Sequence, residues 1–288
     1  MKGVEKMATV TGRIKEIKQP QGGYIKPSKF STTIIDDRKE LNPKENVHGI
    51  IIGIAVDYLT RFLMGSDVYE AFKISMKGAL IAEKYEGVKN AKFIAYELID
   101  GITGLNKESI INACKLVTFD VWYRNLPWAF RAKTYRDTNP DKETIENIKI
   151  LIKRCKTFFK KYGPITQDGF DFYPEEKNHE IYENMILSGN GSYGGYTATV
   201  TNGDGDFLTA DTLWDLKVSK SKPTNKNTLQ LLMYWIMGQH SGQEIYKNIT
   251  KIGIFNPRLN TVFLHDINDI PESVIKAVEK EVICYDEI

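Results

Sequence analysis

The chain has few cysteines and histidines, and their spacing excludes the common metal sites built from them. The three cysteines, Cys114, Cys155 and Cys284, lie far apart and form no Cys-x-x-Cys pair. Three thiols cannot hold a four-cysteine iron–sulfur cluster, and such scattered cysteines are typical of proteins in a reducing cytoplasm. The four histidines are isolated and lack zinc-ligand spacing.

The sequence also lacks an excess of one charge and a long apolar run. Lys and Arg number 39 against 37 Asp and Glu, a net charge of +2. Any attraction to nucleic acid must therefore come from local patches. The N-terminus has no apolar core of a signal peptide, and the longest apolar run, 50–56, stops at Asp57. We expect no membrane segment and a cytoplasmic location.

Length and hydrophobic content fit an enzyme with a substantial core. The 288 residues, 42% of them hydrophobic, suffice for one large domain or two closely packed ones. Residues 1–46 are rich in Lys, Gly and Pro and predict an irregular lead-in, 47–163 show helical periodicity, and 164–288 contain most strand-like segments. We expect an α/β protein in which a helical N-terminal half forms one wall of a cleft beside a mixed sheet flanked by helices.

Local signals place several elements. Asn106 is expected to cap one helix, and Asn139 with Pro140 to open a long amphipathic helix that Gly163 and Pro164 end. The strand-like segments are 180–187, 196–201, 207–208, 213–218 and 252–255.

The stretch from Asp206 to Lys217 predicts a short hairpin with charged groups on one face. From residue 213 onward apolar and polar residues alternate, so Asp215 and Lys217 share the face opposite to the apolar side chains. The polar residues between the two strands suit a tight turn. If 207–208 pair with 213–214, Asp206 comes close to Asp215.

Two carboxylates that share a site repel each other unless a cation lies between them. Oxygen ligands favour magnesium or manganese, which keep bound waters, one of which can become a nucleophile. An ammonium group at Lys217 would then orient that water and neutralise charge on a phosphate. The pattern predicts a metal-dependent attack on phosphate.

Gly203-x-x-Asp206, Asp215-Leu-Lys217 and Gln230-x-x-x-Tyr234 resemble the motifs of the PD-(D/E)XK nuclease superfamily, especially its RecB-like and phage exonuclease branch. The resemblance covers about the last third of the chain. It implies a restriction-endonuclease-like core with a divalent-metal-dependent phosphodiesterase activity on DNA.

The same resemblance assigns roles to single residues. It implies that Asp206 and Asp215 are metal ligands, that the Leu216 carbonyl reaches the metal, and that Lys217 is the catalytic lysine. It also implies that Gln230 and Tyr234 flank the site, and residues four apart do share one helix face.

A further acidic residue is expected upstream. RecB-like chains tend to carry Gly-x-x-x-His-x-x-x-Glu on an early helix, whereas this chain has Gly53 and Asp57 in place of the histidine and the glutamate. Asp57 is one candidate third ligand, directly or through water, and the alternative is a polar residue at the solvent edge of an apolar helix. Glu183, just before the motif strands, is the other candidate.

The loop after the motif is rich in lysine. Lys220 and Lys222 are predicted to hold backbone phosphates beside the cleavage centre, the alternative being a solvated loop. Phe170, Phe172 and Tyr173 are expected to pack against the core, with base stacking as the alternative.

The expected function is a magnesium- or manganese-dependent DNA exonuclease of phage or bacterial recombination or repair. The alternatives are a restriction-type endonuclease and a DNA-binding module of the same fold that does not cut. The sequence leaves open the polarity of digestion, whether the chain acts as a homo-oligomer, and whether a single-strand annealing or recombination protein is its partner.

Overall fold

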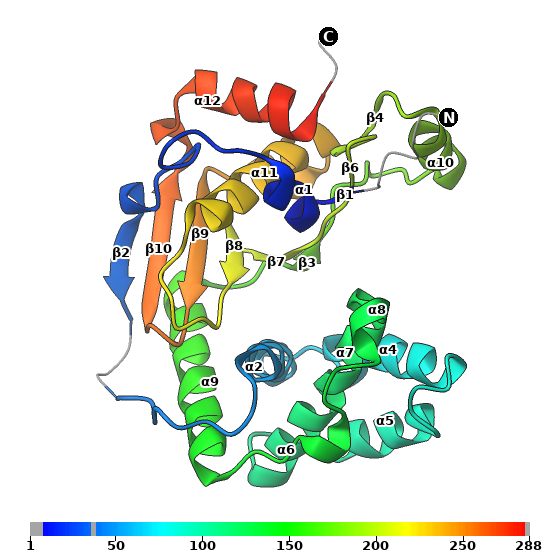
Figure 1. Ribbon diagram of the computed structural model, residues 1–288. Helices are drawn as coiled ribbons and strands as arrows, with labels where there is room; N and C mark the ends of the chain where they lie inside the picture. Colours follow the sequence, from blue (N-terminus) through cyan, green and yellow to red (C-terminus); the bar gives the residue numbers. More distant parts are fainter. Residues whose placement is uncertain (1–7, 36–38, 286–288) are drawn as a thin grey trace.

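The computed structural model describes residues 8–35 and 39–285 and is built around one mixed sheet (Figure 1). The strand order is β2-β10-β9-β8-β7-β3, and only β8 and β9 run parallel to each other. The strands are β2 (Ser31–Ile34), β3 (Gln167–Phe170), β7 (Gly205–Leu208), β8 (Thr212–Leu216), β9 (Lys251–Asn256) and β10 (Thr261–Asp266). The expected α/β class with a mixed sheet flanked by helices is confirmed.

Two small pairs of strands lie outside this sheet. They are β1 (Ala8–Thr9) with β6 (Val200–Asn202), and β4 (Ser192–Tyr193) with β5 (Tyr196–Thr197). The short helix α1 (Val10–Glu16) follows β1 and packs against α11 (Asn225–Ser241). This part of the molecule therefore brings residues 8–16 against segments 200–202 and 225–241.

Alternating side chains of the sheet fill two separate cores. Leu213 of β8 belongs to the core under α11, which also receives the C-terminal helices α12 (Glu272–Ala277) and η6 (Val278–Ile283). Trp214, the next residue, belongs to the opposite core with the long helix α9 (Lys142–Tyr162). The predicted alternation in this strand is thus confirmed.

An aromatic group fixes α9 to the centre of the sheet. Phe158 stacks parallel to Phe255 of β9, with ring centroids 4.3 Å apart and an interplanar angle of 3°. It also meets Trp214 edge-on at 4.9 Å. Such contacts add to the free energy gained by burying the rings.

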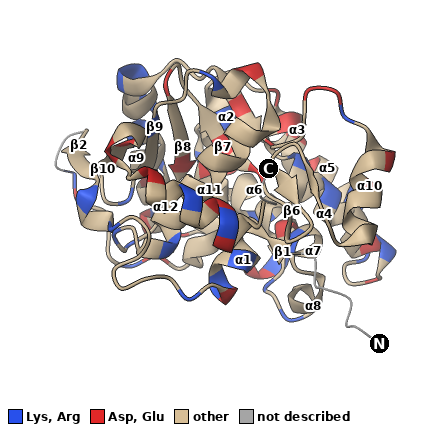
Figure 2. Cartoon of the chain, turned by 90° about the horizontal axis from the view of Figure 1, so that it is seen from above, with Lys and Arg blue, Asp and Glu red and all other residues tan. Residues whose placement is uncertain are grey.

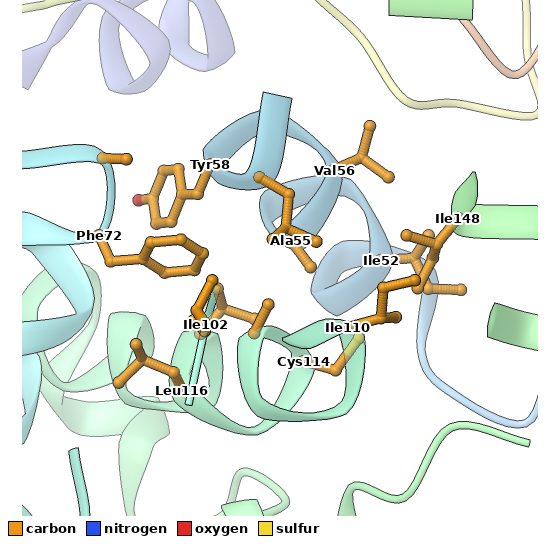
Figure 3. Close-up of a cluster of buried hydrophobic side chains, with 14 of the residues drawn as sticks. Ile52, Ala55, Val56, Tyr58, Phe72, Ile102, Ile110, Cys114, Leu116 and Ile148 are labelled. Carbon is orange, nitrogen blue, oxygen red and sulfur yellow. The ribbon is translucent and has the colours of Figure 1, made fainter. Parts of the chain in front are cut away.

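The remaining helices form a helical body beside α9, with which they share one hydrophobic core (Figure 1). They are α2 (Gly49–Leu63), α3 (Val68–Ala71), α4 (Lys73–Lys84), α5 (Ala91–Asp100), α6 (Lys107–Leu116), α7 (Asp120–Arg124) and α8 (Leu126–Ala129). Figure 3 shows the core of this body, where Tyr58 and Phe72 meet edge-on at 5.3 Å. Asn106 caps α6 as predicted, since its Oδ1 accepts from the Ser109 N–H at 2.9 Å.

Three sequence expectations need correction. The segment 1–46, expected to be irregular, contains α1, β1 and β2, and β2 forms the edge of the main sheet. The N-cap of α9 is Asp141, not Asn139, because its carboxylate accepts from the Thr144 N–H at 2.8 Å. The segment 180–187 is not a strand but lies in α10 (His179–Ser188), which Asn178 caps.

No described helix is both long enough and apolar enough to cross a membrane. Seen from above, basic and acidic residues are interspersed along the chain (Figure 2). This distribution agrees with the nearly balanced composition.

Candidate active site

The hairpin of β7 and β8 brings Asp206 and Asp215 to one place. Phe207 pairs with Trp214 and Leu208 with Leu213, which is the predicted register. In an antiparallel pair, the residues just before and after these partners lie opposite each other and on the same face. Asp206 and Asp215 therefore lie side by side on the sheet face that meets α11.

Direct contacts hold both carboxylates. The Leu216 N–H donates to Asp206 Oδ2 at 2.6 Å, and Lys217 Nζ donates to Asp215 Oδ1 at 2.8 Å. The second oxygen of Asp215, Oδ2, is buried and has no hydrogen-bond partner among the described residues. A buried carboxylate oxygen without a partner is costly, so it is a place where a ligand would bind.

The charged groups at the site change each other's pKa values. Burial raises the pKa of Asp206 well above its ordinary value, and the nearby charges of Asp215 and Asp57 raise it further. For Lys217, burial lowers the pKa, but Asp215 and Asp206 outweigh this and raise it overall. The neighbouring carboxylates therefore favour the ammonium form of the lysine, and a further positive charge at the site would favour the ionised form of Asp206.

These properties fit a divalent cation. Asp206 and Asp215 offer oxygen ligands, one of them without a partner, and a cation would relieve their repulsion. Within the described ranges, no group of three or more His, Cys, Asp or Glu side chains converges as a metal site. A metal here would rest on these two carboxylates, with a main-chain oxygen such as that of Leu216 and waters completing its shell.

One face of α2 turns toward the same place. Gly53, Asp57 and Arg61 follow each other at intervals of four and so share a helix face. A Cβ at Gly53 would lie 3.6 Å from the Val218 side chain, just beyond β8. Asp57 and Arg61 line a cavity of about 10 Å³, together with Asp206. Such a cavity has room for about one water molecule.

Asp57 thus lies beside the carboxylate pair. Its pKa is raised to about 6, chiefly by burial, while Arg61 opposes the rise and Asp168 adds to it. Arg61 Nε lies 2.9 Å from Asp168 Oδ1. The position suits a group that acts on Asp206 through charge or through one water, since the three aspartates do not converge as a ligand set.

Arg61 and Asp168 were missed in the sequence. Arg61 could have been predicted to lie near the site, because it follows Asp57 by four residues on a predicted helix. Asp168 had none, since it reaches the site only through the pairing of β3 with β7.

Gln230 and Tyr234 lie on α11 above the hairpin. Gln230 Nε2 donates to Tyr234 Oη at 2.9 Å, and both side chains are buried. Burial raises the pKa of Tyr234 well above its ordinary value, and the charge of Asp215 adds to the rise. The tyrosine is therefore neutral and within electrostatic reach of the carboxylates.

The other predicted residues lie further out. Glu183 is exposed on α10, where its Oε1 lies 3.2 Å from His179 Nε2, and Figure 1 places α10 at the opposite edge of the molecule from β8. Lys220 is exposed and lies 3.9 Å from Glu45, which also pairs with Arg258. Lys222 is exposed in the loop between β8 and α11.

Phe170 and Phe172 are buried, and Tyr173 packs at the edge of the same core. Their predicted packing is confirmed, so they do not provide a base-stacking surface.

Comparisons of the chain with models of protein families, with curated proteins and with solved structures find no match. The function must therefore be inferred from the geometry of Asp206, Asp215 and Lys217.

Proposed function

We propose that the protein is a divalent-metal-dependent DNA nuclease that hydrolyses phosphodiester bonds at the Asp206–Asp215 pair. The observation that carries this proposal is the buried, unpartnered Oδ2 of Asp215 beside a second carboxylate and a lysine ammonium. A structural ion pair would need only Lys217 and Asp215. The carboxyl group of Asp206 adds a second oxygen ligand, and a bound cation would relieve the repulsion between the two carboxylates.

Asp206 and Asp215 would hold magnesium or manganese, which would polarise the phosphate and lower the pKa of a bound water. Lys217 keeps its proton, because Asp215 and Asp206 stabilise its charge. Its ammonium group would orient the attacking water and neutralise charge that develops on the phosphate oxygens. The Leu216 N–H fixes the orientation of the Asp206 carboxylate.

Gln230 and Tyr234 would border the site from the side of α11. The Gln230–Tyr234 hydrogen bond holds two polar groups in a buried position close to Asp215. Lys222, in the loop that joins β8 to α11, is exposed and would contact the DNA backbone near the cut. We further propose exonuclease rather than endonuclease activity, and magnesium as the cofactor in the cell.

The test is cleavage of linear and closed-circular duplex DNA with magnesium, with manganese and with EDTA, by the wild type and by Lys217→Ala. The matched control is Lys251→Ala, because Lys251 also pairs with an aspartate, Asp211, at 2.6 Å but at the other end of the hairpin. We expect metal-dependent loss of linear DNA that only Lys217→Ala abolishes.

Nicked or linearised circles would replace the exonuclease proposal with an endonuclease. Intact DNA under every metal, from a protein that still retards DNA on a gel, would leave a binding module without nuclease activity. Equal cleavage by Lys217→Ala and by the wild type would show that the Asp206–Asp215 pair is not the site of hydrolysis.

A further inference from the structure

The segment 121–136, from α7 through α8 to the turn at Tyr135–Asp137, concentrates positive charge. It contains four basic residues, and the nearest acidic residues, Asp120 and Asp137, lie just outside its two ends. The whole chain carries a net charge of only +2. The basic residues are Arg124, Arg131, Lys133 and Arg136, and all four are exposed. A local patch of this kind attracts phosphates regardless of the overall charge.

The same segment exposes large aromatic rings. Trp128 is 56% exposed, Phe130 60% and Tyr123 48%. Phe130 is held in place because its ring meets the buried Trp122 edge-on at 4.8 Å. Exposed aromatic rings interleaved with basic side chains form the type of surface on which unpaired bases stack while cations hold the backbone.

Arg124 links this surface to the candidate active site. Its guanidinium lies 3.4 Å from the buried Asp120 carboxylate and donates to Tyr58 Oη at 3.3 Å. Tyr58 is the neighbour of Asp57 on α2. Although burial opposes it, Tyr58, Asp120 and Asp204 raise the pKa of Arg124, and Asp204 lies two residues before Asp206.

Buried contacts also make Arg124 rigid. Asp120 accepts from Tyr58 Oη at 2.7 Å and from Ser75, so its carboxylate is fixed from two sides. An arginine held in this way loses little conformational freedom when it binds a phosphate. Its side chain is nevertheless half exposed and accessible to a ligand.

We propose that segment 121–136 binds single-stranded DNA and leads it to the active site. Bases stack on Trp128 and Phe130, Arg131 and Lys133 hold the backbone, and Arg124 holds a phosphate next to the cleavage centre. This inference rests on the proposed nuclease function and specifies its substrate as DNA with an unpaired strand at the site.

Single-stranded DNA fits the surface better than the other partners. In a duplex the base faces are already stacked and do not reach a protein ring from the outside. A protein partner recognised by apolar contact would not require four exposed cations among the aromatic rings. Arg124 follows the exposed Tyr123 and contacts Tyr58, the neighbour of Asp57 on α2, which fits a strand that runs from the aromatic rings toward the site.

The test is fluorescence anisotropy of a labelled 12-nucleotide thymidine homopolymer, in EDTA so that no cleavage occurs. The variants are Trp128→Ala, Trp128→Leu, and Arg131→Ala with Lys133→Ala. The matched control is Phe93→Ala, because Phe93 is 63% exposed on α5 of the same helical body, where the charges are mixed. Circular dichroism checks that each variant is folded.

We expect both Trp128 variants to weaken binding by about tenfold, because leucine keeps apolar area but offers no ring. The double variant should make the dependence of log affinity on log salt shallower by about 1.4, since each lost contact with a single strand contributes about 0.7. Phe93→Ala should bind as the wild type does. A 12-base-pair duplex should bind more weakly and respond little to Trp128→Ala.

Unchanged affinity of the Trp128 variants, or no binding of the oligonucleotide by the wild type, would overturn the inference. Equal losses for the duplex would overturn its restriction to single strands. Loss of binding in a protein that cleaves no DNA with any metal would support the surface but reject the nuclease. Metal-dependent cleavage by the wild type, with unaltered DNA binding by the Trp128 variants, would support the nuclease but reject the surface.

Discussion

Lys217 and Asp215 form an ion pair in which only one carboxylate oxygen is used: Lys217 Nζ lies 2.8 Å from Oδ1, and the buried Oδ2 has no hydrogen-bond partner among the described residues. The pair is therefore incomplete as a structural salt bridge. It leaves one oxygen for a ligand, and the neighbouring Asp206 brings a second carboxyl group to the same point.

Replacing Lys217 should impair the chemical step more than the fold. We expect Lys217→Ala to lower kcat by about 10²- to 10³-fold, the usual effect of removing one group that stabilises transition-state charge. Lys217→Arg should recover only part of this loss, because a planar guanidinium does not reproduce the compact ammonium contact. Steady-state cleavage of linear DNA in magnesium measures both, and full activity of the arginine variant would contradict the assigned role.

Asp206→Asn should stabilise the metal-free protein. The folded pKa of Asp206 lies well above the unfolded value, so the folded state binds this proton more tightly than the unfolded chain. Its carboxylate therefore costs stability above the folded pKa, and the fold regains stability as the pH falls through that value. Thermal unfolding in EDTA at pH 8 should show a higher Tm for the variant.

The control for this prediction is to repeat the thermal unfolding of both proteins in magnesium. The ion should raise the Tm of the wild type, because it binds the folded state, and should raise that of Asp206→Asn much less. A variant with a lower Tm than the wild type in EDTA would show that Asp206 serves the fold rather than a ligand.

Asp57 should titrate close to pH 6 in the metal-free protein. Burial is the main cause of the raised pKa, and Arg61 holds it down. Arg61→Ala should therefore move the midpoint to a higher pH. Carboxyl carbon chemical shifts of labelled aspartate, followed by NMR from pH 3 to 9, give both midpoints. A midpoint near 4 in the wild type would mean that Asp57 faces open solvent.

Gly205, the residue before Asp206, should tolerate no side chain. A Cβ there would lie 1.8 Å from the Phe170 ring, which is itself buried. We expect Gly205→Ala to lower the free energy of unfolding by about 1–3 kcal/mol through overpacking. Gly49→Ala is the control, since nothing lies within 4 Å of the added carbon and alanine favours the helix. Urea denaturation compares the two, and equal stability would contradict the packing of β7.

The hairpin could be predicted because its information is local. Asp206 and Asp215 are separated by a turn of polar residues, and the alternation in β8 fixes which side chains share a face. The start of α6 at Asn106 and the end of α9 at Gly163 could be predicted for the same reason, because the signals lie at the ends of single helices. The interpretation of 180–187 failed because a short apolar run does not distinguish strand from helix, and the Asn178 cap decided the outcome.

The other parts of the site depend on contacts between distant segments. Asp168 reaches Arg61 only after β3 pairs with β7, and Arg124 reaches Tyr58 only after α7 packs in the helical body. Phe170 and Phe172 are buried as predicted, but the exposure of Trp128 was not predicted. Exposure is a result of tertiary packing, which no local pattern encodes.

The stacking of Phe158 on Phe255 means that the sheet and the helices before it cannot be separated. Removing everything before residue 164 would uncover one whole face of the sheet, including Trp214, and also delete Asp57. A fragment with only the Asp-x-Lys motif would retain both carboxylates in sequence but have an apolar surface prone to aggregation. The motif residues lie in the last third of the chain, but the packing around them depends on helices that precede residue 164.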